Sequence, residues 1–522
     1  MTGTVGRVLR PARFRHARSL LEGRRDVVVD VSVAALVTAV AAVVRFVGIG
    51  DQSFWVDETV TATLVSGSFS DLVSALPHSE STPPLYYLLA WCWSRLFGTG
   101  EAALRSLSAL FGTLTVPVAL AAGRELVSRR TGLIVGAFAA VSPVLVWYSQ
   151  EARAYALFIF LGALSLLAFV RALETRGTTA AARWAVVSAL VIATHYFGVF
   201  LVAAEAAFLL YRRRCRTVVV ATAGLAAAAV ALLPLAAYQA KHASSSWIRS
   251  VDLHLRLEET VAQLLVPSRP SIWAGAGVPE SPVAWWPLGL VALAAAACAA
   301  VLLHRGRQRR GVVTSLVLGI AAAGGPVVVS LASAALVAGR GDVLLFRNVL
   351  CAWLPLQIVV AAALAAPRAG RAGLAAAAAW TAASLAVLGM NATTAHLQRD
   401  DWRLLARATR GEGHAIVLSP SWEVAGLEYY APRLSPPSSV ARLREIDVLV
   451  RRRMPSYSTP VRAFVPPPGF ERVEQRTLQN WVLTRFRASK PVEVTSAQLN
   501  NVRPPGASYV VLQRLAPTGG RR

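Results

Sequence analysis

The sequence predicts an α-helical polytopic membrane protein of about eleven spans that ends in a small extracytoplasmic α/β domain. Of its 522 residues, 55% are hydrophobic and only 16% are charged, and the mean hydropathy is +0.50. An average soluble domain carries about 25% charged residues. Long apolar runs fill the first three quarters of the chain, and mixed, more polar sequence follows. These observations exclude a single soluble globule and a disordered chain.

The N-terminal 26 residues contain seven arginines and precede the apolar stretch 27–47. This stretch is longer than the apolar core of a secretory signal peptide and has no clear small-residue cleavage site. We therefore expect a basic cytoplasmic N-terminus over 1–26, followed by an uncleaved first span. The net charge of +25 lies mostly between apolar runs, so we attribute it to membrane topology and expect no nucleic-acid partner.

Further spans are expected wherever about 20 apolar residues can cross about 30 Å of hydrocarbon. The stretch 184–211 is too long for one span and predicts a hairpin of two. Arginine clusters in alternate connections place those connections in the cytoplasm, which puts the N-terminus inside and the C-terminus outside. The other predicted spans are 105–124, 132–148, 154–171, 217–238, 284–303, 312–337, 343–366 and 373–391, within a membrane domain over 27–391.

The apolar segment 84–97 is not counted as a span. If it crossed the bilayer, Arg129, Arg130 and every later arginine cluster would move to the outside. We therefore expect an amphipathic helix at the outer surface, within a long outer loop over 48–104. A second long outer loop is expected over 239–283.

The C-terminal part, 392–522, changes to short apolar runs separated by Pro/Gly turns. These runs lie at 415–419, 447–450, 480–486 and 508–515. This pattern predicts strands of a small soluble α/β domain. The pair Asp400-Asp401 precedes a helical run and is expected to cap it. All four cysteines lie in or beside apolar segments, so no disulfide framework or metal motif is predicted.

Two adjacent carboxylates, Asp57 and Glu58, follow the first span. A carboxylate at this position can act as a general base on an acceptor hydroxyl, while its neighbour orients it or holds a cation. The alternative is a capping role, because acidic residues stabilise the first turn of a helix.

Four other sequence segments with ionisable or aromatic residues fall on the outer face, where Asp57 and Glu58 are also predicted to lie. Arg347 enters an apolar stretch there, and ionisable groups at membrane depth are costly and usually functional. His195 and Tyr196, at the hairpin tip, either line this site or anchor the hairpin at the interface. Arg45, near the outer end of span one, either reaches a lipid phosphate or snorkels. The strings are HSESTPPLYY at 78–87, YSQEARAY at 148–155, THYFG at 194–198 and FRN at 346–348.

The order of these strings resembles the GT-C membrane glycosyltransferases, most closely glycosyltransferase family 39 and its protein mannosyltransferase-like and aminoarabinose transferase-like relatives. The similarity covers about residues 45–365, and YSQEARAYAL, beginning at Tyr148, is its most specific string. The tail from Asp400 is similar to the outer C-terminal domain of the same proteins.

The resemblance implies a GT-C fold in the plasma membrane and a hexosyl or pentosyl transfer with inversion. The donor would be a polyprenyl-phosphate sugar, with mannose or arabinose as the natural analogues. The acceptor would be a glycan, lipid or protein of the cell envelope on the outer face.

The resemblance also implies roles for individual residues. Asp57 would be the catalytic base, Glu58 its partner and Glu151 a second acidic contact. Arg347 would hold the lipid phosphate, with Arg153 supporting the site. The remaining substrate-binding candidates are His78, Glu80, Tyr86, His195 and Tyr196.

A metal site is left open by the sequence. Relatives often have a histidine or an acidic residue just before the Pro-Pro pair, where this chain has Thr82. Glu58, Glu80 and His78 lie nearby and are the candidate ligands of a divalent cation such as Mg²⁺, Mn²⁺ or Ca²⁺. The alternative is a site without a cofactor.

The rival interpretation is a non-catalytic membrane protein, either a transporter or lipid flippase or a cell-envelope assembly factor. A transporter should place ionisable residues near the midplane and often shows inverted repeats. Here the charges gather at one predicted outer face and no repeat is visible. The sequence therefore favours the enzyme.

Overall fold

The computed structural model describes most of the chain. Residues 1–9 of the predicted basic N-terminus lie outside the described residues, as do 243–247, 249–251 and 268–285 of the predicted second outer loop. The described residues are 10–175, 177–242, 248, 252–267, 286–336, 343–411, 414–431, 434–435, 440–451, 466–495, 498–499 and 510–514.

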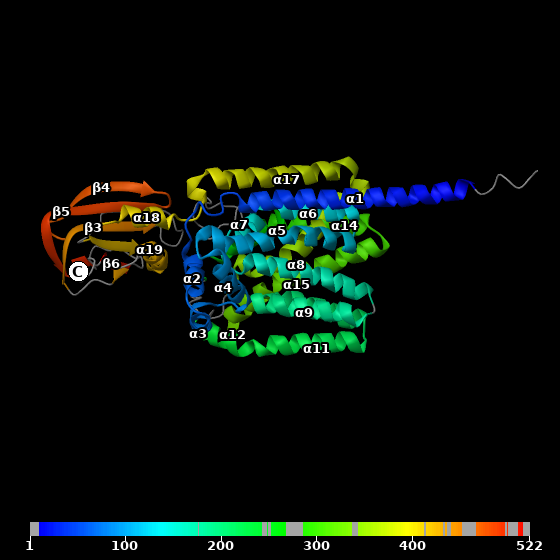
Figure 1. The fold of residues 1–522 in the computed structure, drawn as a ribbon, viewed down its shortest axis with the longest axis horizontal. Helices are drawn as coiled ribbons and strands as arrows, with labels where there is room; N and C mark the ends of the chain where they lie inside the picture. The colour runs from blue at the N-terminus through cyan, green and yellow to red at the C-terminus, as the bar shows by residue number, and fades with distance from the viewer. Residues whose placement is uncertain are drawn as a thin grey trace, which may run out of the picture.

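Most of the structure is a bundle of long apolar helices that run side by side (Figure 1). Among the described residues, eight stretches are long and apolar enough to cross a membrane. They lie in α1 (Arg10–Phe46, apolar over Val28–Phe46), α5 (Glu101–Leu126), α8 (Tyr155–Glu174), α11 (Arg216–Ala231) with α12 (Leu233–His242), α14 (Trp286–Leu303), α15 (Gly306–Leu336, apolar over Gly306–Ala332), the 3-10 helix η2 (Phe346–Ala352) with α16 (Trp353–Ala365), and the 3-10 helix η3 (Pro367–Ala369) with α17 (Gly370–Thr393).

A ninth span is formed if α6 (Arg129–Val141) and α7 (Pro143–Ser149) are taken together, although they bend by 53° at Ser142. The bend follows from Pro143, which lacks the backbone N–H needed to continue the helix. The predicted hairpin is present as α9 (Thr178–Thr194) and α10 (Gly198–Arg212), with a turn between them. Both are shorter than the eight long stretches, so the count of eleven spans stays a prediction.

One end of the bundle is basic. Arginines from successive connections form ion pairs there with acidic residues of neighbouring helices, which brings these connections together. This end lies opposite the C-terminal sheet, as the course of α1 shows in Figure 1. The pairs are Arg124 and Arg129 with Asp30, Arg171 with Glu125, and Arg307 with Glu174.

Three short helices lie at the other end of the bundle, the end that carries the C-terminal domain: α2 (Val56–Ser66), α3 (Phe69–Ser79) and α4 (Leu85–Phe97). The 13 residues of α4 span only about 20 Å at the helical rise, short of the roughly 30 Å of hydrocarbon. This length agrees with the surface helix predicted over 84–97, while its depth in a bilayer stays a prediction.

The C-terminal region contains a six-stranded sheet with the order β2-β6-β1-β3-β5-β4. Only β1 and β3 are parallel, and the other neighbours are antiparallel. The described parts of the four apolar runs contribute to β1, β3, β5 and β6. A helical protein with a small C-terminal α/β domain is therefore confirmed, while its orientation in a membrane stays a prediction. The strands are β1 (His414–Ser419), β2 (Leu434–Ser435), β3 (Val440–Arg451), β4 (Glu471–Leu478), β5 (Trp481–Thr495) and β6 (Val510–Arg514).

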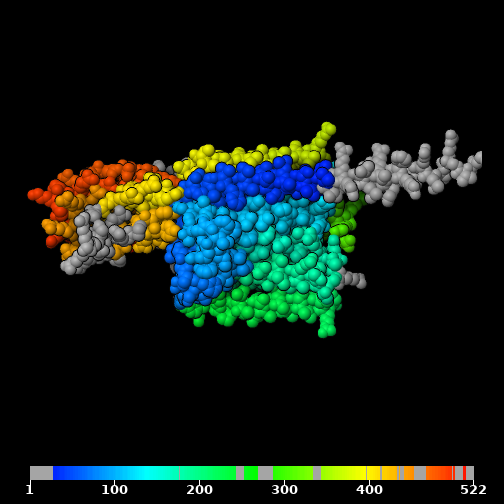
Figure 2. Space-filling view, in the orientation of Figure 1, coloured from blue at the N-terminus to red at the C-terminus, as the bar shows by residue number. Residues whose placement is uncertain are grey.

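The sheet buries both faces, because successive residues of a strand point to opposite sides. In β1, Ala415 and Val417 join one apolar cluster, while Ile416 and Leu418 join the other. The second cluster includes residues of α18 (Trp402–Ala408) and α19 (Val424–Tyr430), and Val56 of α2 packs against it. The domain therefore continues directly into the end of the bundle, as the space-filling view shows (Figure 2).

Candidate active site

Asp57 and Arg347 meet at the end of the bundle that carries α2. Asp57 is the second residue of α2, and Arg347 is the second residue of η2. An Nη1–H of Arg347 donates to Oδ2 of Asp57 at 3.1 Å, although 290 residues separate them in the sequence. Their side chains are 23% and 31% exposed, respectively. The structure thus brings the predicted base and the predicted phosphate-binding cation together, in a place that solvent reaches.

Glu58, in contrast, is completely buried and saturated with hydrogen bonds. Its Oε1 accepts from Arg105 Nε at 2.8 Å and from the Ala152 amide at 2.7 Å. Its Oε2 accepts from Arg105 Nη2 at 2.6 Å and from the Trp55 amide at 3.2 Å. Burial alone would raise the pKa of Glu58, but the Arg105 charge and hydrogen bonds outweigh it, so the pKa lies below its ordinary value. The capping role considered for the Asp-Glu pair is therefore performed by Glu58.

Arg105 was not identified as a candidate from the sequence, but it binds the segment that leads into α2. Besides binding Glu58, it donates to the backbone carbonyls of Ile49, Gln52 and Ser53 at 3.1, 2.7 and 2.8 Å. The sequence feature that could have identified it is its position at the start of the apolar stretch 105–124, where an unpaired charge would be costly.

Glu80 and Arg153 form a second buried pair. Nη1 and Nη2 of Arg153 donate to the two carboxylate oxygens of Glu80 at 2.5 and 2.8 Å. Nη1 also donates to the backbone carbonyl of Asp57 at 3.3 Å. Burial would lower the pKa of Arg153, but the Glu80 charge keeps it well above its ordinary value. Arg153 is therefore a permanent cation that supports the first turn of α2.

Glu151 lies in the turn between α7 and α8 and is buried. Its Oε2 accepts from Arg399 Nη2 at 3.2 Å, and its Oε1 has no hydrogen-bond partner among the described residues. Burial raises the pKa of Glu151 to about 7. Its carboxyl is thus divided between its two protonation states near neutral pH.

The four predicted aromatic and histidine residues differ in their burial and in their contacts. Tyr86 is buried, with its hydroxyl 3.2 Å from Ser108 Oγ. His195 is also buried and stacks on Phe158 with the ring centroids 4.5 Å apart. His78 is exposed, and its Nδ1 lies 2.9 Å from the Tyr238 hydroxyl. Tyr196 donates its hydroxyl to Oε1 of Gln239 at 2.7 Å.

The predicted metal ligands do not meet at one centre. The oxygens of Glu58 bind Arg105 and two backbone amides, and those of Glu80 bind Arg153, while His78 contacts Tyr238. Mg²⁺ and Ca²⁺ need several oxygen ligands around one centre, and the oxygens of both carboxylates already accept from arginines. These three residues, as arranged here, do not fit a shared cation.

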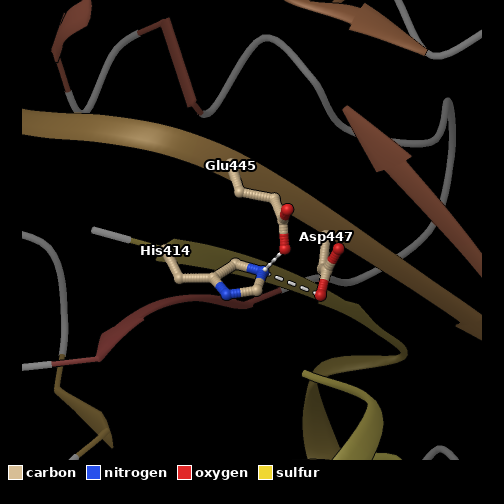
Figure 3. A group of neighbouring side chains, drawn as sticks. All are labelled: His414, Glu445 and Asp447. Carbon is tan, nitrogen blue, oxygen red and sulfur yellow. Dashed lines mark ion pairs between the residues drawn. The ribbon is translucent and has the colours of Figure 1, made fainter. Parts of the chain in front are cut away.

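The described residues contain one set of three with metal-ligand spacing, and it lies in the sheet domain (Figure 3). Nε2 of His414 is 3.0 Å from Glu445 Oε1 and 2.8 Å from Asp447 Oδ2. Arg485 already pairs with both carboxylates of this group, because its Nε lies 3.0 Å from Glu445 Oε1 and 2.8 Å from Asp447 Oδ1. The group is best described as a buried ion network that joins β1, β3 and β5.

Arg45 follows neither of the two predicted alternatives, because it is fully buried inside the bundle. It donates to the carbonyls of Ala139 and Ala140 at 2.8 and 2.7 Å, and to Ser149 Oγ at 3.2 Å. These carbonyls end α6 and lose helical partners at the Pro143 bend. Arg45 therefore stabilises the bend between α6 and α7.

Comparison with known proteins supports the resemblance found in the sequence. Residues 81–238 match the model of the dolichyl-phosphate-mannose-protein mannosyltransferase family. This segment includes Tyr86, Glu151, Arg153, His195 and Tyr196, and the match confirms the similarity to GT-C glycosyltransferases. No curated protein sequence matches the chain.

Several solved structures are similar in outline. ArnT from Cupriavidus metallidurans in the apo state is 13% identical, with a TM-score of 0.43 over 86% of this chain and 97% of that chain. The archaeal oligosaccharyltransferase AglB from Archaeoglobus fulgidus is 13% identical, with a TM-score of 0.44 over 77% and 63%. The arabinofuranosyltransferase AftD from Mycobacteria is 16% identical, with a TM-score of 0.38 over 88% and 42%.

Proposed function

We propose that this protein is an inverting glycosyltransferase of the plasma membrane. It moves a hexose or pentose from a polyprenyl-phosphate donor to a glycan, lipid or protein of the cell envelope on the outer face. The observation that carries the proposal is the Asp57–Arg347 pair, with the two side chains 3.1 Å apart and partly exposed.

Arg347 is suited to the phosphate of the donor. A guanidinium group presents several N–H donors in a fixed fork that matches phosphate oxygens. In the present structure its partner is the carboxylate of Asp57. A donor phosphate would compete for this guanidinium, and Asp57 would then be released beside the reacting centre.

Asp57 is suited to the proton transfer. As the acceptor oxygen attacks the anomeric carbon, its proton passes to the Asp57 carboxylate. The bond between the anomeric carbon and the phosphate oxygen breaks, and its electron pair stays on the phosphate, whose charge Arg347 stabilises. Glu58 is bound by Arg105 and Arg153 is bound by Glu80, so these residues hold the first turn of α2 in place.

The proposal is tested by incubating the purified full-length protein with a panel of polyprenyl-phosphate sugars and a membrane extract as acceptor source. Free polyprenyl phosphate is measured by mass spectrometry. Release from at least one mannose or arabinose donor is expected. If no donor in the panel releases polyprenyl phosphate, while a known transferase does so under the same conditions, the proposed activity is wrong.

A further inference from the structure

The loop 51–55, which leads into α2, is bound directly to the C-terminal domain. Ser53 Oγ donates to the backbone carbonyl of Asp400 at 2.9 Å and accepts from the Trp402 amide at 2.8 Å. Ser53 and Trp402 are both completely buried. The start of α18 therefore fixes this loop through buried hydrogen bonds, which are expensive to leave unmade.

A second connection runs through Tyr430, the last residue of α19. Its hydroxyl accepts from the Phe54 amide at 2.7 Å and donates to Glu101 Oε1 at 2.8 Å. The ring of Phe54 meets the ring of the neighbouring Tyr429 edge to face, with the centroids 5.8 Å apart. One hydroxyl thus joins the sheet domain to both the loop and the first residue of α5.

The apolar cores of the two parts also interpenetrate. Val56, the first residue of α2, packs against the cluster under the sheet, while Tyr429 and Tyr430 pack against the cluster of the bundle. Asp57 is the next residue after Val56. The position of its carboxylate therefore depends on packing contributed by the C-terminal domain.

Arg399, just before α18, contacts the turn between α7 and α8, whose Ala152 amide binds Glu58. The Arg399 guanidinium lies 4.2 Å from the centroid of the Trp147 ring, and its Nη2 donates to the Trp147 carbonyl at 3.0 Å and to Glu151 at 3.2 Å. Ala152, in this turn, donates its amide to Glu58. Residues 399–402 thus contact both the loop that leads into α2 and the turn whose Ala152 amide binds Glu58.

We propose that the C-terminal domain is a positioning element of the active site, and that the Tyr430 hydroxyl sets the placement of Asp57 relative to Arg347. This inference rests on the proposed role of Asp57 as the base. Tyr430 acts through the Phe54 amide, so it is a positioning residue. A displacement of a reacting group by about 1 Å can cost on the order of 100-fold in rate.

The test compares Tyr430→Phe with Tyr429→Phe in the purified full-length protein. Both variants lose one hydroxyl from adjacent residues of α19, but the Tyr429 hydroxyl makes no hydrogen bond within the described part of the chain. Tyr430→Phe should lower kcat by about 10- to 100-fold with the donor Kd unchanged. Tyr429→Phe should retain the wild-type kcat. Ser53→Ala, which removes the other connection, should behave like Tyr430→Phe.

Hydrogen exchange gives a readout that does not depend on activity. The peptide that covers residues 51–58 should exchange faster in Tyr430→Phe than in Tyr429→Phe, because the Phe54 amide loses its acceptor. An unchanged kcat in folded Tyr430→Phe and Ser53→Ala would overturn the positioning role, whatever the exchange shows. If the wild type itself transfers no sugar, the proposed function fails, and exchange alone decides whether Tyr430 orders the loop.

Discussion

At the scale of single residues, neighbouring carboxylates have opposite surroundings. Glu58 is buried and accepts four hydrogen bonds, whereas Asp57 is partly exposed and accepts from Arg347. A general base must reach its substrate and exchange a proton, which a saturated carboxylate cannot do. Glu58 is therefore a positioning residue, and Asp57 is the candidate base.

The Asp57→Asn variant tests the base directly. Asn keeps the size of the side chain and its ability to accept a hydrogen bond from Arg347, but it is not basic. Turnover should fall about 100-fold or more, with the fold little changed. Donor binding should be retained or tightened, because a neutral amide competes less than a carboxylate with the donor phosphate for Arg347. Near-normal turnover by the folded variant would rule out Asp57 and redirect attention to Glu151.

Arg347 is tested by donor binding. Arg347→Ala should weaken the binding of polyprenyl phosphate, and Arg347→Lys should restore only part of it, because a point charge cannot reproduce the forked geometry. Dissociation constants measured with the purified variants check this order. Wild-type affinity in Arg347→Ala would mean that another cation holds the phosphate.

At the scale of elements, the sequence predicts what depends on local pattern. The long helices follow apolar runs, the bend follows Pro143, and Asp401 caps α18 as expected, with Oδ1 accepting from the Leu404 amide at 3.1 Å. Strand β4 was missed because its exposed, charged sequence has no apolar alternation, and its pairing with β5 holds it in the sheet.

The contacts that build the site could not be predicted in the same way. Arg105 binds Glu58 across 47 residues, Arg399 binds Glu151 across 248, and Tyr430 binds Phe54 across 376. Each contact forms only because two segments far apart in the sequence pack together in the fold. No local sequence pattern indicates which segments do so. The sequence supplied the candidates Asp57 and Arg347, but not the residues that hold them in place.

The buried Glu58–Arg105 pair should stabilise the junction of α2 and α5. Glu58→Gln leaves the guanidinium without its counter-charge and should cost about 3 kcal/mol of unfolding free energy, measured as a lower thermal midpoint in detergent. Asp57→Asn, one residue away and partly exposed, is the matched control and should change the midpoint little. Equal midpoints for the two variants would contradict a stabilising pair.

The pH dependence of this pair has a defined sign. The pKa of Glu58 in the folded protein lies below its ordinary value of 4.5, so the unfolded chain binds this proton more readily. Its stabilising contribution is complete above about pH 4.5 and disappears as the pH falls through the folded pKa. The wild type should therefore lose more stability on acidification than Glu58→Gln does.

At the scale of the whole molecule, the bundle has two chemically different ends. Arginines from several connections gather at one end, while Asp57, the short helices and the sheet domain share the other. Basic connections are retained on the cytoplasmic side. This arrangement predicts that the candidate site and the C-terminal domain face the outside, where a lipid-linked donor would present its sugar.

Cysteine labelling in right-side-out vesicles tests this orientation. Cys215 is exposed within the basic connection 212–216, and its hydrogen bond with the Thr217 hydroxyl lowers its pKa, which favours reaction with a maleimide. Val473, exposed on β4, is the outer position. One variant keeps Cys215 and lacks the other three cysteines, and the second lacks all four and carries Val473→Cys.

A membrane-impermeant maleimide should label Val473→Cys in intact vesicles, and Cys215 only after permeabilisation. The permeabilised sample is the control for reactivity, because both thiols must react there for the comparison to count. Labelling of Cys215 in intact vesicles would place the basic end outside. The Asp57–Arg347 pair would then face the cytoplasm, where a donor on the outer leaflet could not reach it. The proposed orientation and the proposed transfer on the outer face therefore depend on the same result.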